Sequence, residues 1–336
     1  MRPERALVRI SGLKTFFSTD FGDTVRAVDG VDLDIIEGKI NGLVGESACG
    51  KSTLSLSIVK LLPSNGRIAD GRILFSGEDL IRKSEDDMRE IRGAQISMIF
   101  QDPTSSLNPV FRIGSQIGEA IELHRFKDEP KELTKKVVRE EVTTILQLLR
   151  VPDAERVASH YPHEYSGGMR QRAMIAMAMS CRPKLLIADE PTTNLDVTIQ
   201  AQVNELILDM VKKLGTTVLL ITHDLGIVAE MCDRVAIMYA GKVVECADTS
   251  TIFKRSKHPY TEALLSSIPR VDIKHKRLEG IPGRVPSLVD PPPGCRFHPR
   301  CRYARAKICT QDPPTVEVEE GHRVACWRYT DVWESD

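Results

Sequence analysis

The sequence of 336 residues contains no long hydrophobic run. No apolar stretch reaches the roughly 18 residues that would make a transmembrane helix a candidate, so we expect no segment to cross a membrane. The first five residues lead directly into a strand-like run at 7–10, without the apolar core of a secretory signal peptide. These absences predict a protein that stays in the cytoplasm.

The chain also lacks an excess of charge of either sign. It carries 46 basic and 47 acidic side chains, a formal net charge of -1, so no overall field indicates binding to nucleic acid. With 41% hydrophobic and 28% charged residues, its composition is that of a globular protein with a core. The length predicts one large domain with a small one, or two domains. No internal repeat is visible, so the chain carries a single working unit.

Strand and helix signals alternate through about residue 255. Short apolar runs typical of buried strands lie at 40–44, 95–100, 185–188 and 217–221, and residues 134–149 form an amphipathic helical pattern. This alternation predicts an α/β domain with a largely parallel sheet. Proline and glycine at 281–283 and 291–294 favour a loop-rich C-terminal segment from about residue 258.

Residues 45–52 match the pattern G-x-x-x-x-G-K-[ST], between a predicted buried strand and a predicted helix over 51–62. Glycines let backbone N–H groups turn toward a phosphate, and the helix start adds its positive dipole end. Lys51 would supply a charge for the β- and γ-phosphates, and Ser52 a hydroxyl for Mg²⁺. The strand–turn–helix context disfavours a chance match. We therefore predict an ATP cradle of Gly45, Glu46, Ser47, Ala48, Cys49, Gly50, Lys51, Ser52 and Thr53.

The apolar run at 185–188 ends in two carboxylates, Asp189 and Glu190. At a strand tip, Asp189 is suited to hold Mg²⁺ directly or through water. Glu190 would act as the general base that polarises the attacking water. The alternative is an ordinary solvated strand end, which the phosphate cradle elsewhere in the chain disfavours.

Residues 165–172, Y-S-G-G-M-R-Q-R, resemble the signature sequence of the ATP-binding cassette (ABC) ATPases. Ser166, Gly167 and Gly168 would open a helix and offer a hydroxyl, free N–H groups and a dipole to an anion. Alone, this could be an ordinary helix N-cap. The resemblance implies an ABC-type P-loop NTPase. Such a fold has a RecA-like core, an antiparallel β subdomain and a helical signature subdomain.

The resemblance assigns further roles. Gln101 would contact Mg²⁺ and sense a membrane partner, Asp196 would belong to the D-loop, and His223 would be the switch histidine that contacts the γ-phosphate. Gln171 would contribute to the nucleotide site. Phe17, with Phe21 as second choice, would stack on adenine.

Three residues depart from the family pattern, at two places in the chain. Ala48 and Cys49 stand where glycine and serine are usual, and Asn194 stands where alanine is usual. Neither departure removes a charged catalytic group. A residue with a Cβ can reach the backbone angles that position 48 needs, so we expect the loop to survive.

Two segments, H-P-Y-T at 258–261 and residues 294–327, resemble the C-terminal extension of peptide-importer ATPases. The resemblance implies an ABC domain over 1–257 and an extension over 258–336. It implies an ATPase that powers di- or oligopeptide uptake, peripheral to the cytoplasmic face of the membrane. Partners would be a second ATPase subunit, identical or paralogous, two permease subunits and, indirectly, a solute-binding protein. A motor for nickel, glutathione or another small solute, or a non-transport ABC ATPase, is the alternative.

Four of the eight cysteines, Cys295, Cys301, Cys309 and Cys326, crowd near the C-terminus. Four thiolates suit Zn²⁺ or a [4Fe–4S] cluster, although neither the usual zinc spacing nor the bacterial ferredoxin run is present. The resemblance favours iron–sulfur, and free or disulfide-linked cysteines are the third possibility. No ATP-site motif lies beyond His223, so we expect the ATP site to be independent of this segment.

Overall fold

The computed structural model describes residues 4–101, 106–124, 134–192, 196–267 and 280–334. The chain divides into two compact units. The first unit comprises residues 1–5, 36–39 and 82–220, and the second comprises 6–35, 40–81 and 221–336. In the part of the chain that the structure describes, no helix is both long and apolar enough to cross a membrane.

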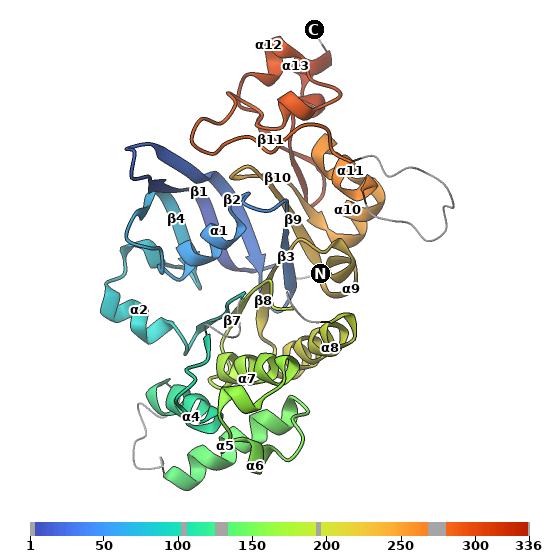
Figure 1. Cartoon of the computed structure of the whole chain (residues 1–336). Helices are drawn as coiled ribbons and strands as arrows, with labels where there is room; N and C mark the ends of the chain where they lie inside the picture. Colours follow the sequence, from blue (N-terminus) through green and yellow to red (C-terminus); the bar gives the residue numbers. More distant parts are fainter. Residues whose placement is uncertain (1–3, 102–105, 125–133, 193–195, 268–279, 335–336) are drawn as a thin grey trace. The chain divides into compact units, whose positions relative to one another are not determined.

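The first unit joins a few parallel strands to a group of helices (Figure 1). Its strands are β6 (Ile96–Ile99), β7 (Leu185–Asp189) and residues 217–220 of β8 (Thr217–Thr222). β6 lies parallel to β7, with Ile96 opposite Leu185. Every residue of β7 is buried, as expected for a parallel strand covered on both faces.

The helices of the first unit follow local sequence signals. Thr134 caps α5 by accepting a hydrogen bond from Val137 N at 3.3 Å, and α5 buries its apolar stripe. The helices are α2 (Glu85–Ile91), α4 (Ile113–His124), α5 (Lys135–Leu148), α6 (Ala154–Val157), α7 (Gly167–Met179) and α8 (Val197–Leu214). Helices α4 to α7 form the expected helical subdomain.

The second unit contains two sheets. The first has the order β2-β1-β4-β5, with β1 antiparallel to β4. The second runs β11-β12-β10-β9-β3, and only β9 and β3 in it are parallel. The strands are β1 (Ala6–Ser18), β2 (Thr24–Ile36), β3 (Ile40–Val44), β4 (Gly66–Phe75), β5 (Glu78–Asp79), β9 (Arg234–Tyr239), β10 (Lys242–Asp248), β11 (Thr315–Glu319) and β12 (His322–Ala325).

Short helices complete the second unit. They are α1 (Lys51–Ile58), α9 (Leu225–Met231), α10 (Thr249–Arg255), α11 (Pro259–Ser266), α12 (Ala306–Cys309) and α13 (Asp331–Glu334). Helix α1 ends earlier than the predicted 51–62, because Lys60 adopts a left-handed φ of 50° that breaks the helical path. The predicted buried strands all form, with bounds shifted by no more than one residue.

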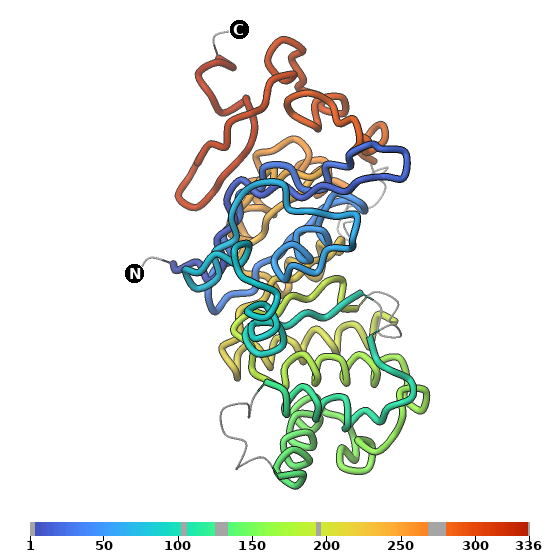
Figure 2. Tube along the Cα trace, turned by 90° about the vertical axis from the view of Figure 1, so that its left-hand side faces the viewer, coloured from blue at the N-terminus to red at the C-terminus, as the bar shows by residue number. Residues whose placement is uncertain are grey.

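The C-terminal segment is more ordered than its proline content predicts. Helix α11 starts directly after His258, and the hairpin of β11 and β12 adds to the sheet, with Val324 of β12 opposite Glu245 of β10. The hairpin is visible in the red part of Figure 2. Phe297, Ile308 and Val324 are buried. The expectation of a loop-rich segment is therefore wrong for these parts, because sheet pairing with β10 supplies a core that the local sequence does not reveal.

Candidate functional site

The predicted phosphate loop connects the end of β3 to the start of α1, within the second unit. Two of its glycines are needed because a side chain at either position would not fit. A Cβ on Gly45 would lie 2.1 Å from the Met238 carbonyl oxygen, and one on Gly50 would lie 2.1 Å from that of Ala27. Gly50 also has a φ of 107°, which other residues rarely adopt. The loop thus lies directly against the backbones of β9 and β2.

Lys51 lies folded across this loop. Its side chain is buried, and Nζ donates to the carbonyl oxygens of Gly45 at 2.8 Å and Glu46 at 3.0 Å. Ser52 is exposed, with its hydroxyl at the first turn of α1. The amide of Gly241 donates to Cys49 O at 2.8 Å and anchors the loop from the β9–β10 turn. A cation and a helix start therefore lie together at the loop, as a phosphate cradle requires.

Two of the three residues that depart from the family pattern lie in the phosphate loop, and both are accommodated. Ala48 has a φ of 59°, inside the small left-handed region, which costs an L-residue about 1–2 kcal/mol. Cys49 is 1% exposed, and burial raises the pKa of its thiol despite the nearby Lys51. Cys49 is therefore an uncharged packing group.

The carboxylates after β7 belong to the first unit. Asp189 is the last strand residue and is 5% exposed. Glu190 has a left-handed φ of 47° and accepts a hydrogen bond from Gln101 Nε2 at 3.2 Å. Residues 89 positions apart are thus brought together, and the structure places the predicted base beside the predicted Q-loop glutamine.

The signature residues begin α7. Ser166 is its N-cap and accepts from Met169 N at 3.3 Å, as the capping alternative anticipated. Gly168 permits close packing, since a Cβ there would lie 2.7 Å from Ile199 Cγ2 of α8. Gln171 is 2% exposed and donates to the carbonyl oxygen of Pro191, so its amide is engaged within the chain.

The structure also shows where the remaining predicted site residues lie. Asp196 caps α8 by accepting from Ile199 N at 3.0 Å, and residues 194 and 195 lie outside the described residues. His223 follows β8 and is exposed. Phe17 lies opposite Gly66 in the β1–β4 pair, whereas Phe21 is 94% exposed. The roles of these residues stay predictions.

The four C-terminal cysteines line one cavity. His258, Phe297, Tyr303 and two tryptophans complete much of its wall. Burial raises the pKa of Cys295 to about 12 and that of Cys326 to about 11, with a smaller contribution from the neighbouring thiols. Within the described ranges, no three His, Cys, Asp or Glu side chains meet closely enough to hold a single metal ion.

The C-terminal segment also contacts the phosphate loop. Arg300 donates from Nη1 to Glu46 Oε2 at 2.9 Å and from Nη2 to Oε1 at 3.3 Å. The Tyr260 hydroxyl accepts a hydrogen bond from the Glu46 amide at 3.0 Å. The predicted ATP cradle and this segment are therefore joined by direct contacts, which the expectation of independence did not include. Arg300 and Glu46 are 254 positions apart, so no local pattern could have signalled the contact.

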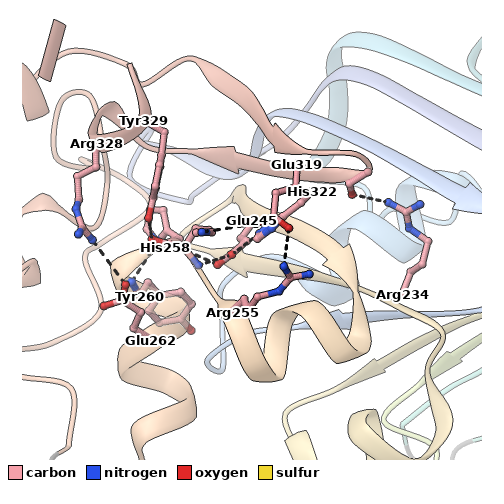
Figure 3. A network of polar contacts seen from close by, with 12 residues as sticks. Arg234, Glu245, Arg255, His258, Tyr260, Glu262, Glu319, His322, Arg328 and Tyr329 are labelled. Carbon is pink, nitrogen blue, oxygen red and sulfur yellow. Dashed lines mark hydrogen bonds and ion pairs between the residues drawn. The ribbon is translucent and has the colours of Figure 1, made fainter. Parts of the chain in front are cut away.

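A buried polar network attaches the C-terminal segment to β10 (Figure 3). The Glu245 carboxylate is 1% exposed and accepts from Lys257 N at 2.6 Å, His258 N at 3.0 Å and His322 Nε2 at 2.8 Å. The Tyr329 hydroxyl donates to Lys257 O at 2.9 Å. Since buried charges are costly unless hydrogen-bonded, this network favours one fixed attachment of α11 and β12 to the sheet.

Comparison with known proteins extends over nearly the whole chain. Residues 28–193 match the family described as ABC transporter, and residues 244–309 match the oligopeptide/dipeptide transporter C-terminal region. The chain is 48% identical to the dipeptide transport ATP-binding protein DppD of Bacillus subtilis over 323 residues, which cover 96% of this chain and 94% of that protein. It is 43% identical to the oligopeptide transport ATP-binding protein OppD of Escherichia coli, over 96% and 93% of the two chains.

Solved structures share the fold. CbiO1 of Clostridium perfringens, part of the ABC transporter complex cbiONQ, is 26% identical with a TM-score of 0.63. The match covers 75% of this chain and 92% of cbiO1. The predicted ABC-type P-loop fold is confirmed, with α/β units, an antiparallel sheet and a helical subdomain.

Proposed function

Because the chain belongs to the family of ATP-binding proteins of oligopeptide and dipeptide ABC transporters, we propose that it hydrolyses ATP to power import of di- or oligopeptides. The observation that carries the proposal is the similarity to peptide-transport ATPases along nearly the full length of both chains, C-terminal region included. Nickel, glutathione or another small solute is the alternative cargo, since the ATPase itself would not contact the solute.

Each predicted site residue has a chemical role in this proposal. Backbone N–H groups of residues 45–52 and the Lys51 ammonium would hold the phosphates. Ser52, Gln101 and Asp189 would hold Mg²⁺, which neutralises phosphate charge when bound. Glu190 would polarise the attacking water as general base, and His223 would contact the γ-phosphate. The hydrogen bond from Gln101 orients the Glu190 carboxylate and supports this assignment.

The working assembly would pair two such subunits. Ser166, Gly167 and Gly168 of one subunit would close over ATP held by the loop of the other, and the closure would drive two permease subunits. The partner subunit would be identical or paralogous, and the assembly would sit at the cytoplasmic face of the membrane. In this proposal residues 1–257 form the nucleotide-binding domain and 258–336 an extension.

We infer that the cysteine-lined cavity holds a [4Fe–4S] cluster, with one zinc ion as the alternative. Four thiols line the cavity, and four cysteine thiolates are the usual ligands of a [4Fe–4S] cluster. His258 adds a second indication. Its Nδ1 accepts from Tyr260 N at 3.1 Å, so its proton lies on Nε2, and this buried donor has no partner among the described residues. Cys295, Cys301, Cys309 and Cys326 would hold the cluster, which would cross-link the segment. Iron and sulfide analysis of anaerobically purified protein tests this, and one zinc with no iron would refute it.

The Glu190→Gln variant tests the ATPase proposal. The amide keeps the shape and can still meet Gln101, but it cannot take a proton, so ATP should bind while turnover falls about 10²–10⁴-fold. Glu205→Gln, which alters an exposed ion pair with Arg150 on α8, is the matched control and should retain turnover. Near wild-type turnover of Glu190→Gln in a steady-state ATPase assay of the assembled transporter would refute the role of Glu190.

A further inference from the structure

The residue that follows the first glycine of the phosphate loop carries a negative charge. Glu46 lies beside the groups that would bind the phosphates of ATP, and its side chain is 24% exposed. An unpaired carboxylate here would repel the phosphates at short range, where the effective dielectric is well below that of water. The loop therefore needs a group that neutralises Glu46 without occupying the phosphate position.

Arg300 meets this need. Its side chain is 7% exposed and forms a two-pronged ion pair with Glu46, at 2.9 Å and 3.3 Å. The guanidinium is itself fixed, since Nε donates to Pro282 O at 2.7 Å and Nη1 to the Tyr239 hydroxyl at 3.2 Å. A bidentate pair of this kind holds the carboxylate in one orientation as well as neutralising it.

The backbone of Glu46 is held from the same side. Its amide donates to the Tyr260 hydroxyl at 3.0 Å. Tyr260 packs against Tyr239 and Phe297, with ring centroids 4.5 Å and 5.4 Å away, and all three rings are buried. Tyr260 and Phe297 both come from the C-terminal segment, so a rigid aromatic cluster fixes the position of the Tyr260 hydroxyl that accepts this hydrogen bond.

We propose that Arg300 is a positioning residue for the phosphate loop: it neutralises Glu46 and, with Tyr260, sets the loop conformation that binds ATP. The proposal rests on the assignment of residues 45–52 as the ATP cradle. Arg300 directly precedes Cys301, so the C-terminal segment links the cysteine-lined cavity to nucleotide affinity.

The test is equilibrium titration of full-length protein variants with a fluorescent ATP analogue. Arg300→Met leaves Glu46 unpaired and should weaken binding about tenfold at low salt, because the unneutralised carboxylate repels the phosphates at an effective dielectric well below that of water. The loss should shrink as salt is raised. Arg300→Lys keeps the charge without the two-pronged geometry and should lose less affinity. Arg302→Met removes an exposed arginine of the same segment, paired with Glu262, and is the matched control with unchanged affinity.

The decisive variant is the double substitution Arg300→Met with Glu46→Gln. Removing the repelling charge should restore affinity to within about twofold of wild type, whereas a loss caused by a loosened segment would persist. Unchanged affinity in Arg300→Met, or a loss that Glu46→Gln fails to repair, overturns the proposal. Lys51→Ala serves to separate the two proposals: if it binds the analogue as tightly as wild type, the cradle assignment itself fails.

Discussion

Replacement of Gly50 by alanine would place a methyl group against the backbone of β2. The added Cβ would lie 2.1 Å from Ala27 O and 2.8 Å from Met238 Cε. The methionine methyl can move, but the carbonyl belongs to a paired strand. The backbone at φ 107° adds strain of about 1–3 kcal/mol, and overpacking adds about 1–3 kcal/mol, so the total cost is about 2–6 kcal/mol. The loop can escape only by moving away from β2.

The movement would reach the start of α1, because Gly50 O accepts the first helical hydrogen bond from Leu54 N at 2.9 Å. We therefore expect Gly50→Ala to bind the ATP analogue more than about tenfold more weakly, a change worth about 1.4 kcal/mol. Its melting temperature should fall by about 3–8 °C. Equilibrium titration and thermal unfolding followed by circular dichroism measure the two effects.

Ala48→Gly in the same loop is the matched comparison. Ala48 already sits at a φ of 59°, and glycine relieves that strain while adding freedom to the unfolded chain, so stability should rise by no more than about 1 kcal/mol. If Gly50→Ala kept both wild-type affinity and wild-type melting temperature, the close contact between the loop and β2 would be wrong. A large loss in Ala48→Gly would equally contradict the reading of the loop as strained at position 48.

Two further changes test the other parts of the site. Ser166→Arg should leave ATP binding to the isolated subunit intact but abolish closure of the pair, measured by ATP-dependent dimerisation. Ser166→Ala loses only the helix cap, worth about 1 kcal/mol, so it separates the effect of the bulky arginine from the effect of losing the cap. If the isolated Ser166→Arg subunit lost ATP affinity as Lys51→Ala does, the proposal that Ser166 contacts ATP held by the other subunit would be contradicted. Cys309→Ser should lose iron. It should also weaken ATP-analogue binding in the same direction as Arg300→Met, because Arg300 directly precedes Cys301 of the cysteine-lined cavity. Iron content equal to wild type would argue against Cys309 as a ligand.

The sequence alone determined the features that depend on near neighbours in the chain. The spacing of Gly45, Gly50 and Lys51 predicts the loop, because strand, turn and helix start must follow one another within a few residues. Apolar runs predict the buried strands, and Thr134 and Ser166 predict helix starts by their capping ability. These signals are local, so the order and type of most elements could be predicted.

Which distant residues meet depends on the path of the folded chain. The hydrogen bond from Gln101 to Glu190 and the ion pair from Arg300 to Glu46 join residues far apart in sequence. Such pairs produce no periodic pattern in the sequence, because each partner is an ordinary polar residue and only the fold brings the two together. The pairing of β12 with β10 likewise turned a proline-rich segment into part of a sheet. Local propensity describes which secondary structure a residue prefers, whereas contacts between distant residues depend on the path of the whole chain. That path brings the C-terminal segment into contact with the phosphate loop.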